Sequence, residues 1–307
     1  MKGNVLVGQS GGPTAVINSS LAGVIQAAKK YGAEKVYGMH YGIEGFLNED
    51  IIDLDDYITC HADISLLKRT PASFLGSCRY KLPPIEGNED VYDKMFDIME
   101  KYNIQYFLYI GGNDSMDTIK MLSDYAAKKD KPQKFMGVPK TIDNDLPLTD
   151  HTPGYGSAAK YIATSMKEII RDNASFGASK PTVCIVEIMG RHAGWLAAAS
   201  ALSKGIDCEG PDLIYLPEVP FDLDSFMTKV KHLAETKRSV VIAVSEGIRL
   251  TDGRFVCELG SMSDYVDAFG HKQLSGCASF LANKVTEATG LNSRPIEFST
   301  LQRCATH

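Results

Sequence analysis

The chain has 307 residues, of which 44% are apolar, and its formal net charge at pH 7 is -6. This composition supplies a large core and excludes an intrinsically disordered chain, and the length fits two ordinary domains or one large one. The acidic balance argues against nucleic acid as a partner, because nucleic-acid-binding proteins present a basic face. A few lysines and arginines gathered in one place would still bind a small anion.

The N-terminal sequence predicts neither secretion nor membrane insertion. Residues 1–4 lead directly into a short apolar run, without the long apolar region of a signal peptide. No stretch approaches the roughly twenty apolar residues of a membrane span. The seven cysteines are scattered, odd in number and without the close spacing of a zinc site. We therefore expect a cytoplasmic protein with reduced thiols and no membrane partner.

Short apolar runs alternate with helical patterns along the whole chain. Strands are expected at 5–7, 36–39, 106–110, 135–138, 182–189, 213–216 and 239–244. Helices are expected at 15–30, 91–102, 115–128, 155–173, 196–203 and 222–236, with a last one ending at Thr289. Residues 45–80 read as a loop-rich region. The alternation predicts an α/β protein with helices on both faces of parallel sheets.

Proline and polar residues cluster at 146–153 and predict a domain boundary there. We expect one lobe over 1–146, which binds the phosphate donor, and a second over 147–307, which binds a sugar phosphate. Each would be a doubly wound, mostly parallel sheet of the Rossmann-like kind, with the active-site cleft between the two.

The first strand ends in Gly11-Gly12, and a helix follows. A strand, a glycine turn and a helix together present backbone N–H groups to an anion. The spacing is neither that of a P-loop nor that of the dinucleotide fingerprint, so a tight turn without a ligand is the alternative. Arg79 follows a run of small residues that would let the backbone approach a phosphate closely, although a lone arginine is usually a surface charge.

Two apolar runs in the middle of the chain end in polar turns. The run at 106–110 is followed by Gly111-Gly112-Asn113-Asp114-Ser115, and the run at 135–138 by residues 139–145. Ligands of open α/β sheets bind beyond the carboxyl ends of the strands, so one crevice should collect Asn113, Asp114, Lys140, Asp143 and Asp145. These groups suit a phosphate and its metal ion. Ser115 is a candidate N-cap of the next helix.

The second half of the chain adds two similar strand ends. The strand at 182–189 runs into Met189-Gly190-Arg191-His192, a glycine turn with a cation that suits an oxyanion. We interpret His192 as structural rather than catalytic. Glu246 follows the strand at 239–244, where a carboxylate accepts sugar hydroxyls or forms a salt bridge at the rim.

Seven of these motifs, in this order, resemble the phosphofructokinase family and in particular its pyrophosphate-dependent branch. They are Gly11-Gly12, 74–79, 111–115, 139–145, 189–194, Glu246 and 294–303. The resemblance implies reversible transfer of a phosphoryl group from pyrophosphate to the 1-hydroxyl of fructose 6-phosphate, giving fructose 1,6-bisphosphate and phosphate. It also implies Mg²⁺ as cofactor and a homodimer or homotetramer.

The resemblance carries roles to individual residues. Asp143 is the implied base, and Lys140, Asp114 and Arg191 complete the catalytic set. The implied substrate contacts are Gly11, Gly12, Arg79 and Gly112 for the donor, and Thr141, Asp145, Met189, Gly190, Glu246, Arg294 and Arg303 for the sugar phosphate. One of the last two arginines comes from a neighbouring subunit in the family. The implied metal ligands are Asn113 and Asp114, although many members have an aspartate at the position of Asn113.

The identity of the donor depends on two positions. ATP-using members resemble this chain but have glycine in place of Asp114 and Lys140. A carboxylate at position 114 would occupy the space of a nucleotide α-phosphate and repel its charge, whereas pyrophosphate ends one phosphate earlier. Lys140 would supply positive charge at the bridging and transferred oxygens.

Three other functions stay open at this point. The first is an ATP-dependent 6-phosphofructokinase, and the second is a non-catalytic sugar-phosphate-binding subunit, for which loss of Asp143 would be the signature. A dinucleotide-dependent oxidoreductase is more distant, since the fingerprint is missing. The sheet and last helices of the family continue beyond the region of Arg303, so we expect the second lobe to be truncated in this chain.

Overall fold

The computed structural model describes residues 2–176, 179–260 and 276–304. The chain divides into two compact units, and the division falls between Thr141 and Ile142. This lies a few residues before the expected boundary, because Ile142 already packs in a core of the second unit. We call the described residues up to Thr141 the first unit and those from Ile142 onward the second unit.

The first unit is an α/β layer structure around a five-stranded sheet with the order β3-β2-β1-β4-β5. Its elements are β1 (Asn4–Gln9), α1 (Ile17–Lys30), β2 (Val36–Met39), α2 (Gly42–Leu47), β3 (Ile51–Asp53), the 3-10 helix η1 (Leu54–Asp56), α3 (His61–Leu67), α4 (Glu89–Lys101), β4 (Ile104–Gly111), α5 (Asn113–Lys128) and β5 (Lys134–Pro139). β1, β2, β4 and β5 are parallel, and only β3 among these strands runs antiparallel to its neighbour.

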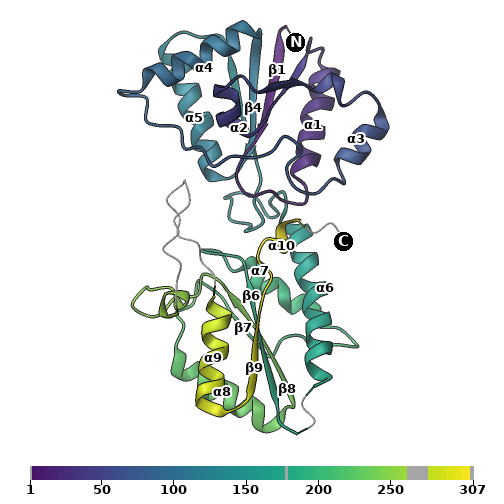
Figure 1. Cartoon of the computed structure of the whole chain (residues 1–307), viewed down its shortest axis with the longest axis vertical. Coiled ribbons are helices and arrows are strands. Elements are labelled where there is room, and N and C mark those ends of the chain that lie inside the picture. The colour runs from purple at the N-terminus through teal and green to yellow at the C-terminus, as the bar shows by residue number, and fades with distance from the viewer. Residues whose placement is uncertain (1, 177–178, 261–275, 305–307) are drawn as a thin grey trace. The chain divides into compact units, whose positions relative to one another are not determined.

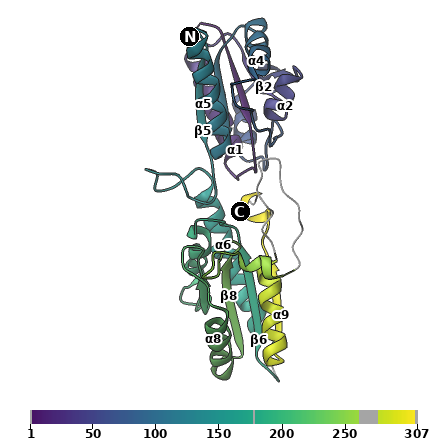
Figure 2. The same ribbon diagram turned by 90° about the vertical axis from the view of Figure 1, so that its left-hand side faces the viewer.

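Helices cover both faces of the first sheet (Figure 1). On one face, α1 and α3 pack on Val5, Val7 and Ile110. On the other, α2, α4 and α5 pack on Leu6 and Phe107. Figure 2 shows α5 alongside β5 on that second face. Alternate strand residues therefore face opposite layers, as the period of two in a strand requires.

The second unit contains a parallel four-stranded sheet with the order β7-β8-β6-β9. Its elements are α6 (Tyr155–Ala174), β6 (Thr182–Ile188), α7 (Trp195–Ala199), the 3-10 helix η2 (Ser200–Ser203), β7 (Leu213–Tyr215), α8 (Leu223–Thr236), β8 (Ser239–Ser245), the 3-10 helix η3 (Val256–Leu259), α9 (Cys277–Thr289), β9 (Asn292–Glu297) and α10 (Leu301–Cys304). Pro295 is tolerated in β9 because β9 is an edge strand.

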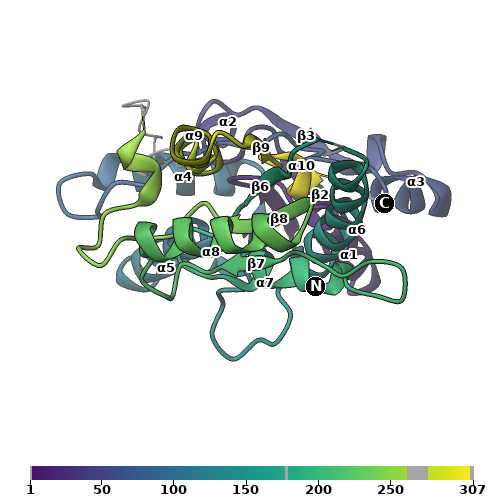
Figure 3. The same cartoon turned by 90° about the horizontal axis from the view of Figure 1, so that it is seen from below.

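Two layers of helices also cover the second sheet. Val183 and Ile185 of β6 face α8 and α9, while Val186 and Ile188 face α6 and α7. In Figure 3, β6 lies between α9 and α6. The sequence prediction of two mostly parallel sheets with helices on both faces is confirmed.

The loop-rich region 45–80 also holds short elements, namely β3, η1, α3 and the end of α2. One local prediction was wrong. Ser115 does not cap α5, because the helix begins earlier, with Gly112 as its N-cap residue. Ser115 lies in the first turn, and its Oγ would be 2.0 Å from a Cβ at Gly111, so the glycine leaves room for it.

The seven cysteines are free thiols. Of the helices in the described ranges, none combines the length and the apolar character that crossing a membrane would demand.

Candidate active site

In the first unit, β1, β4 and β5 are neighbours, so their carboxyl ends lie side by side. Gln9 pairs with Ile110, and Gly111 pairs with Pro139. The chain leaves β1 toward β2 on one side and later returns to β4 on the other side. Such a reversal of strand order opens a crevice at the carboxyl ends, which is where open α/β sheets bind ligands.

A cavity of about 170 Å³ occupies this position. It is lined by Gly11, Gly12, Arg79, Gly112, Asp114, Ser115 and Lys140. Six of these seven residues were predicted from the sequence to contact the donor or to take part in transfer. Ser115 was considered only as a helix cap, and its position three residues after Gly112, on the first turn of α5, is the signal that would have revealed it.

The turn after β1 brings the backbone close to this cavity. Gly11 has φ +72°, a conformation that favours glycine, and its N–H donates to the carbonyl of Cys78 at 3.1 Å. The hydroxyl of Ser77 donates to the carbonyl of Gly11 at 2.6 Å. A Cβ at Gly11 would lie 3.3 Å from Nζ of Lys140, so a larger residue would press on the ammonium.

Lys140 brings a buried positive charge to the same cavity. The residue is 6% exposed, and its ammonium donates to the carbonyl of Gly12. Its backbone N–H donates to the carbonyl of Gly111 at 3.0 Å, which joins the end of β5 to the end of β4. A cation held in this way, next to glycine turns, is a strong attraction for a phosphate oxygen.

The N-terminus of α5 forms the opposite wall. Gly112 and Asp114 line the cavity there, and the exposed side chain of Asn113 does not. The helix start offers backbone N–H groups and a partial positive charge to an anion. Asp114 places a carboxylate beside them, which suits a metal ion bound to the anion better than it suits the bare anion. Asn113 therefore has weaker support as a metal ligand than Asp114.

In the second unit, the carboxyl ends of β6 and β8 are joined through Gly190 and Glu246. The N–H of Gly190 donates to Oε1 of Glu246 at 3.3 Å, and the hydroxyl of Ser245 donates to the carbonyl of Gly190 at 2.6 Å. Gly190 has φ +136°, and a Cβ there would lie 2.4 Å from the carbonyl of Ala193. Only glycine fits this turn without distortion.

The side-chain carboxyl of Glu246 has a strongly raised pKa. Burial raises the pKa of its carboxyl from 4.5 to about 8, and the charges of Asp143 and Glu187 act in the same direction. The N–H of Gly190 and the guanidinium of Arg191 oppose the shift of this pKa. Two other predicted residues, Asp143 and Arg191, are therefore within electrostatic reach of Glu246, as a polar substrate site requires.

The loop that carries the two aspartates after Thr141 is held in place by hydrogen bonds of Asn144. Asn144 lies between Asp143 and Asp145, is 6% exposed and has φ +57°. Its amide donates to the carbonyl of Asp150 at 3.0 Å and accepts from the N–H of Thr152 at 2.9 Å. Asp143 is half-buried, whereas Asp145 is exposed and lines a cavity of about 630 Å³ together with residues of the loop and Trp195.

The two arginines expected to grip one phosphate are far apart in the second sheet. Arg294 pairs with Cys184 in the first half of β9, and its guanidinium forms an ion pair with Asp172 at 2.5 Å. Arg303 lies in α10, which follows the carboxyl end of β9. Nε of Arg303 is buried and has no hydrogen-bond partner in the described part of the chain. Within one chain the structure does not bring the two arginines together.

Sequence reasoning missed Gln302. The residue is 2% exposed, its Oε1 accepts from the N–H of Met189 at 3.2 Å, and its Nε2 donates to the carbonyl of Ser299 at 3.0 Å. It thereby ties α10, which carries Arg303, to Met189 directly after β6. His192 is exposed, and its Nδ1 lies 2.9 Å from a guanidinium nitrogen of Arg249, in keeping with the structural role expected for it.

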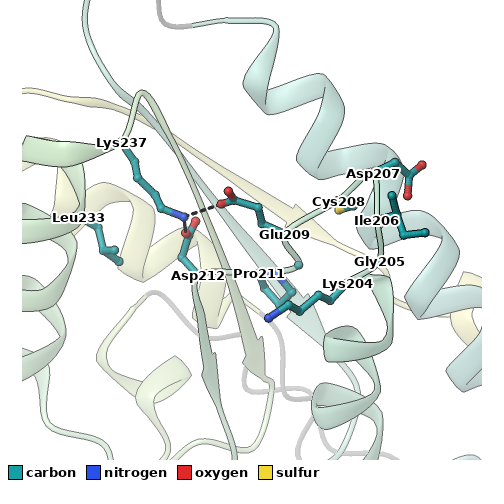
Figure 4. Close-up of a pocket in the computed structure, with 11 residues that line it drawn as sticks. Lys204, Gly205, Ile206, Asp207, Cys208, Glu209, Pro211, Asp212, Leu233 and Lys237 are labelled. Carbon is teal, nitrogen blue, oxygen red and sulfur yellow. Dashed lines mark hydrogen bonds and ion pairs between the residues drawn. The ribbon is translucent and has the colours of Figure 1, made fainter.

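A larger cavity, of about 680 Å³, lies at the other end of the second sheet (Figure 4). Its residues precede β7 and β8, and Nζ of Lys237 contacts Glu209 at 2.9 Å and Asp212 at 2.7 Å. None of the sequence-predicted site residues lines it. Because ligands of open α/β sheets bind at carboxyl ends, this amino-end cavity is not the expected substrate site.

Comparison with known proteins agrees with this geometry. Residues 4–307 match the family model described as phosphofructokinase. The chain is 43% identical over 306 residues to the pyrophosphate–fructose 6-phosphate 1-phosphotransferase of Halomonas elongata, covering 99% of this chain and 72% of that protein. The protein of the same name from Xanthomonas campestris is 43% identical over 305 residues, with the same coverage of both chains.

A solved structure gives the same result. The crystal structure of the pyrophosphate-dependent phosphofructokinase from Nitrosospira multiformis matches with a TM-score of 0.84 and 39% identity, covering 98% of this chain and 70% of that one. The resemblance inferred from seven sequence motifs is confirmed. The chain belongs to the phosphofructokinase family.

Proposed function

We propose that the protein transfers a phosphoryl group reversibly from pyrophosphate to the 1-hydroxyl of fructose 6-phosphate. The products are fructose 1,6-bisphosphate and phosphate. The names of the relatives from Halomonas and Xanthomonas support this donor and this acceptor. The observation that carries the proposal is the small cavity of the first unit, with Lys140 and Asp114 in its wall.

The volume of that cavity bears on the donor. At about 170 Å³ it is smaller than the roughly 300–1,000 Å³ of sites that enclose drug-sized ligands. A small inorganic diphosphate suits such a space, with its oxygens facing the glycine N–H groups, Arg79 and Lys140. The carboxylate of Asp114 would repel the additional phosphate of a nucleotide.

The residues of the second unit suit the acceptor. In the proposed reaction Asp143 takes the proton of the 1-hydroxyl as its oxygen attacks the terminal phosphorus of pyrophosphate. The bond from that phosphorus to the bridging oxygen breaks, and the leaving phosphate keeps the electron pair. Arg191 and Lys140 neutralise the charge on the transferred group, which is the main contribution that proteins make to phosphoryl transfer.

The other groups of the second unit would hold the sugar phosphate. Glu246, neutral at pH 7 by its raised pKa, can donate to or accept from a sugar hydroxyl, and the Met189–Gly190 backbone lies beside it. The buried Nε of Arg303 is a donor that a 6-phosphate could satisfy. Thr141, the last residue of the first unit, and Asp145 keep the roles that the family resemblance implies.

For the expected Mg²⁺, the chain offers one candidate ligand, Asp114, rather than a complete set of protein ligands among the described residues. No group of three or more histidines, cysteines or carboxylates in the described ranges could hold a metal ion by itself. Mg²⁺ is usually bound by one or two carboxylates and by substrate phosphates, so we propose that it arrives with pyrophosphate and that Asp114 contacts it. When bound, it would neutralise charge on the phosphate oxygens.

We also propose a cytoplasmic homodimer or homotetramer. Arg294 is held by Asp172, away from Arg303, so it would reach a sugar phosphate only in a neighbouring subunit. The molar mass in solution, measured by light scattering, tests this, and a monomer at assay concentrations would contradict it.

The decisive experiment compares donors. Fructose 6-phosphate is incubated with pyrophosphate or with ATP, and fructose 1,6-bisphosphate is measured in each case. Turnover with pyrophosphate and little with ATP is expected, and the reverse would show an ATP-dependent enzyme. Asp143→Asn is the control, because loss of a positioned base typically lowers rates by about 10²–10⁴. Sugar-phosphate binding without turnover by either donor would indicate a non-catalytic subunit.

A further inference from the structure

Two buried carboxamides, Gln9 and Asn18, lie next to the Gly11–Gly12 turn of the first unit. Both are fully buried, at 0% exposure. Nε2 of Gln9, at the end of β1, donates to Oδ1 of Asn18 in the first turn of α1 at 2.9 Å. Neither side chain lines the donor cavity. Buried polar groups of this kind are costly unless satisfied, so their bonds need an account.

Asn18 satisfies all four of its hydrogen-bonding positions. Its Nδ2 donates to the carbonyls of Thr70 at 2.9 Å and Ala72 at 2.8 Å. Its Oδ1 accepts from Gln9 and also from the N–H of Phe74 at 2.9 Å. An asparagine amide has two donors and two acceptor lone pairs, and each has a partner here.

Gln9 extends the same network by one residue. Its Oε1 accepts from the N–H of Leu75 at 2.9 Å. Ala72 has φ +62°, an unfavourable conformation for a residue with a Cβ, and the bond from Asn18 to its carbonyl helps to hold it. The stretch 70–75, between α3 and α4, forms no helix or strand. The two carboxamides supply hydrogen bonds to its backbone that regular structure would otherwise provide.

The same segment continues into the wall of the donor cavity. After Leu75 come Ser77 and Cys78, which bond to the backbone of Gly11 through the Ser77 hydroxyl and the Cys78 carbonyl. Arg79 follows and lines the cavity. The wall is therefore anchored at two places, by the carboxamides at 70–75 and by the turn at 77–78.

We propose that Gln9 and Asn18 are positioning residues that set the affinity for the phosphate donor by holding the segment 70–79 against the Gly11 turn. This deepens the proposed function and rests on it for the identity of the donor. The effect reaches pyrophosphate through Arg79 and the backbone of Gly11, and it leaves the sugar-phosphate residues of the second unit unchanged.

The test uses Asn18→Asp, a change of nearly equal shape. An ionised carboxyl cannot donate to the carbonyls of Thr70 and Ala72, and a protonated one has a single O–H, so the wall loses at least one bond. We expect the KM for pyrophosphate and the Kd from titration calorimetry with inorganic pyrophosphate to rise by about tenfold or more, equivalent to at least about 1.4 kcal/mol. The KM for fructose 6-phosphate should stay within about twofold.

Asn173→Asp is the matched control. Asn173 is also a fully buried asparagine at 0% exposure, and its Nδ2 donates to Ser239 Oγ at 2.8 Å, in the second unit. The same chemical change there should leave pyrophosphate binding unaltered. The inference is overturned if both variants weaken pyrophosphate binding equally. It is also overturned if Asn18→Asp raises neither the Kd nor the KM for pyrophosphate.

If circular dichroism shows that Asn18→Asp does not fold, a milder variant tests the inference instead. Gln9→Glu removes the amide donor from Gln9 to Asn18 but keeps an oxygen that accepts from the N–H of Leu75, and it should raise the Kd for pyrophosphate about threefold. An unchanged Kd would then overturn the inference. Failure of the proposed function gives a different result, because the parent protein would then neither bind nor turn over pyrophosphate.

Discussion

At the scale of residues, two buried carboxyl groups of the second unit have raised pKa values. Glu187 is 5% exposed, and burial raises its pKa to about 7, with Glu297 acting in the same direction. Its Oε2 accepts from the N–H of Ala278 at the start of α9 at 2.9 Å, which opposes the shift of that pKa. Glu246 has its pKa raised to about 8. Both groups bind a proton in the folded protein at pH values where the unfolded chain has lost it.

These shifts predict a pH dependence of stability. Because the folded pKa of Glu246 is raised, its contribution is fully present below about pH 4.5 and is lost as the pH rises toward 8. The variant Glu246→Gln should therefore gain stability relative to the parent between pH 5 and 8, by no more than about 1.4 kcal/mol per pH unit. Denaturation midpoints of both proteins across this range measure it.

Glu34→Gln serves as the control for that series, because Glu34 is an exposed carboxylate between α1 and β2. Its difference from the parent should not vary over the same pH range. A flat difference for Glu246→Gln as well would show that Glu246 is ionised in the folded protein at neutral pH.

The donor residues allow a second prediction at this scale. Asp114 and Lys140 both line the small cavity, so the double variant Asp114→Gly with Lys140→Gly removes a carboxylate and enlarges the space. We expect ATP to become a measurable donor, while turnover with pyrophosphate falls because a buried cation is lost. Initial rates with the two donors test this. If the double variant still refuses ATP, steric and charge exclusion at these two positions does not explain donor choice.

At the scale of elements, the predicted site residues of the second sheet lie at strand ends, and the turns there restrict which residues fit. β6 is buried along its whole length and β8 from Val240 onward, and Glu246 directly follows β8. The Gly190 turn, the Ser245 hydroxyl and the Glu246 carboxyl form one hydrogen-bonded unit across the two strands. The geometry of the site is thus set where regular structure stops, by bonds between two strand ends.

Gly190→Ala tests this arrangement. The new Cβ would meet the carbonyl of Ala193 at 2.4 Å, and φ +136° is unfavourable for alanine, so we expect a loss of about 1–3 kcal/mol in the free energy of unfolding. The KM for fructose 6-phosphate should rise as well, because distortion of the turn would move the N–H of residue 190 away from Glu246. Chemical denaturation and initial rates measure the two effects.

The control is Gly23→Ala in α1, where a Cβ would meet nothing within 4 Å. Alanine forms helices better than glycine, by roughly 0.8–1 kcal/mol, so this variant should equal or exceed the parent in stability. Equal stability of the two variants would mean that the turn after β6 can relax at little cost.

At the scale of the whole molecule, the chain consists of two units with separate cores, and the residues proposed for the two substrates divide between them. The proposed donor groups up to Lys140 belong to the first unit, and Asp143, Arg191, Glu246 and Arg303 belong to the second. Each substrate should therefore leave its own signature in the part of the chain that binds it.

Hydrogen exchange gives the corresponding prediction. Pyrophosphate should slow exchange in the segments after β1 and β4, and fructose 6-phosphate in those after β6 and β8, because a ligand stabilises the parts of the native state that it contacts. Chloride at matched ionic strength is the control. Protection by pyrophosphate confined to the second unit would contradict the assignment of the donor site.

Much of the fold was predictable because its signals are local. Buried parallel strands read as short apolar runs, and β2 begins and ends where its run does. The polar turns that follow β1, β4, β5 and β6 could be recognised as site segments because strand ends in such sheets face ligands. The start of α5 was misjudged because Gly111 and Ser115 interlock only in three dimensions.

The sequence by itself determined the alternation of strands and helices, the family and the residue types at the strand ends, since each depends on neighbours along the chain. Only the tertiary structure decided that Gln9 and Asn18 hold a segment more than fifty residues away, and that Gln302 binds Met189. It likewise decided that Arg294 and Arg303 lie apart. Such contacts join groups remote in sequence, and no local pattern encodes which buried amide meets which carbonyl.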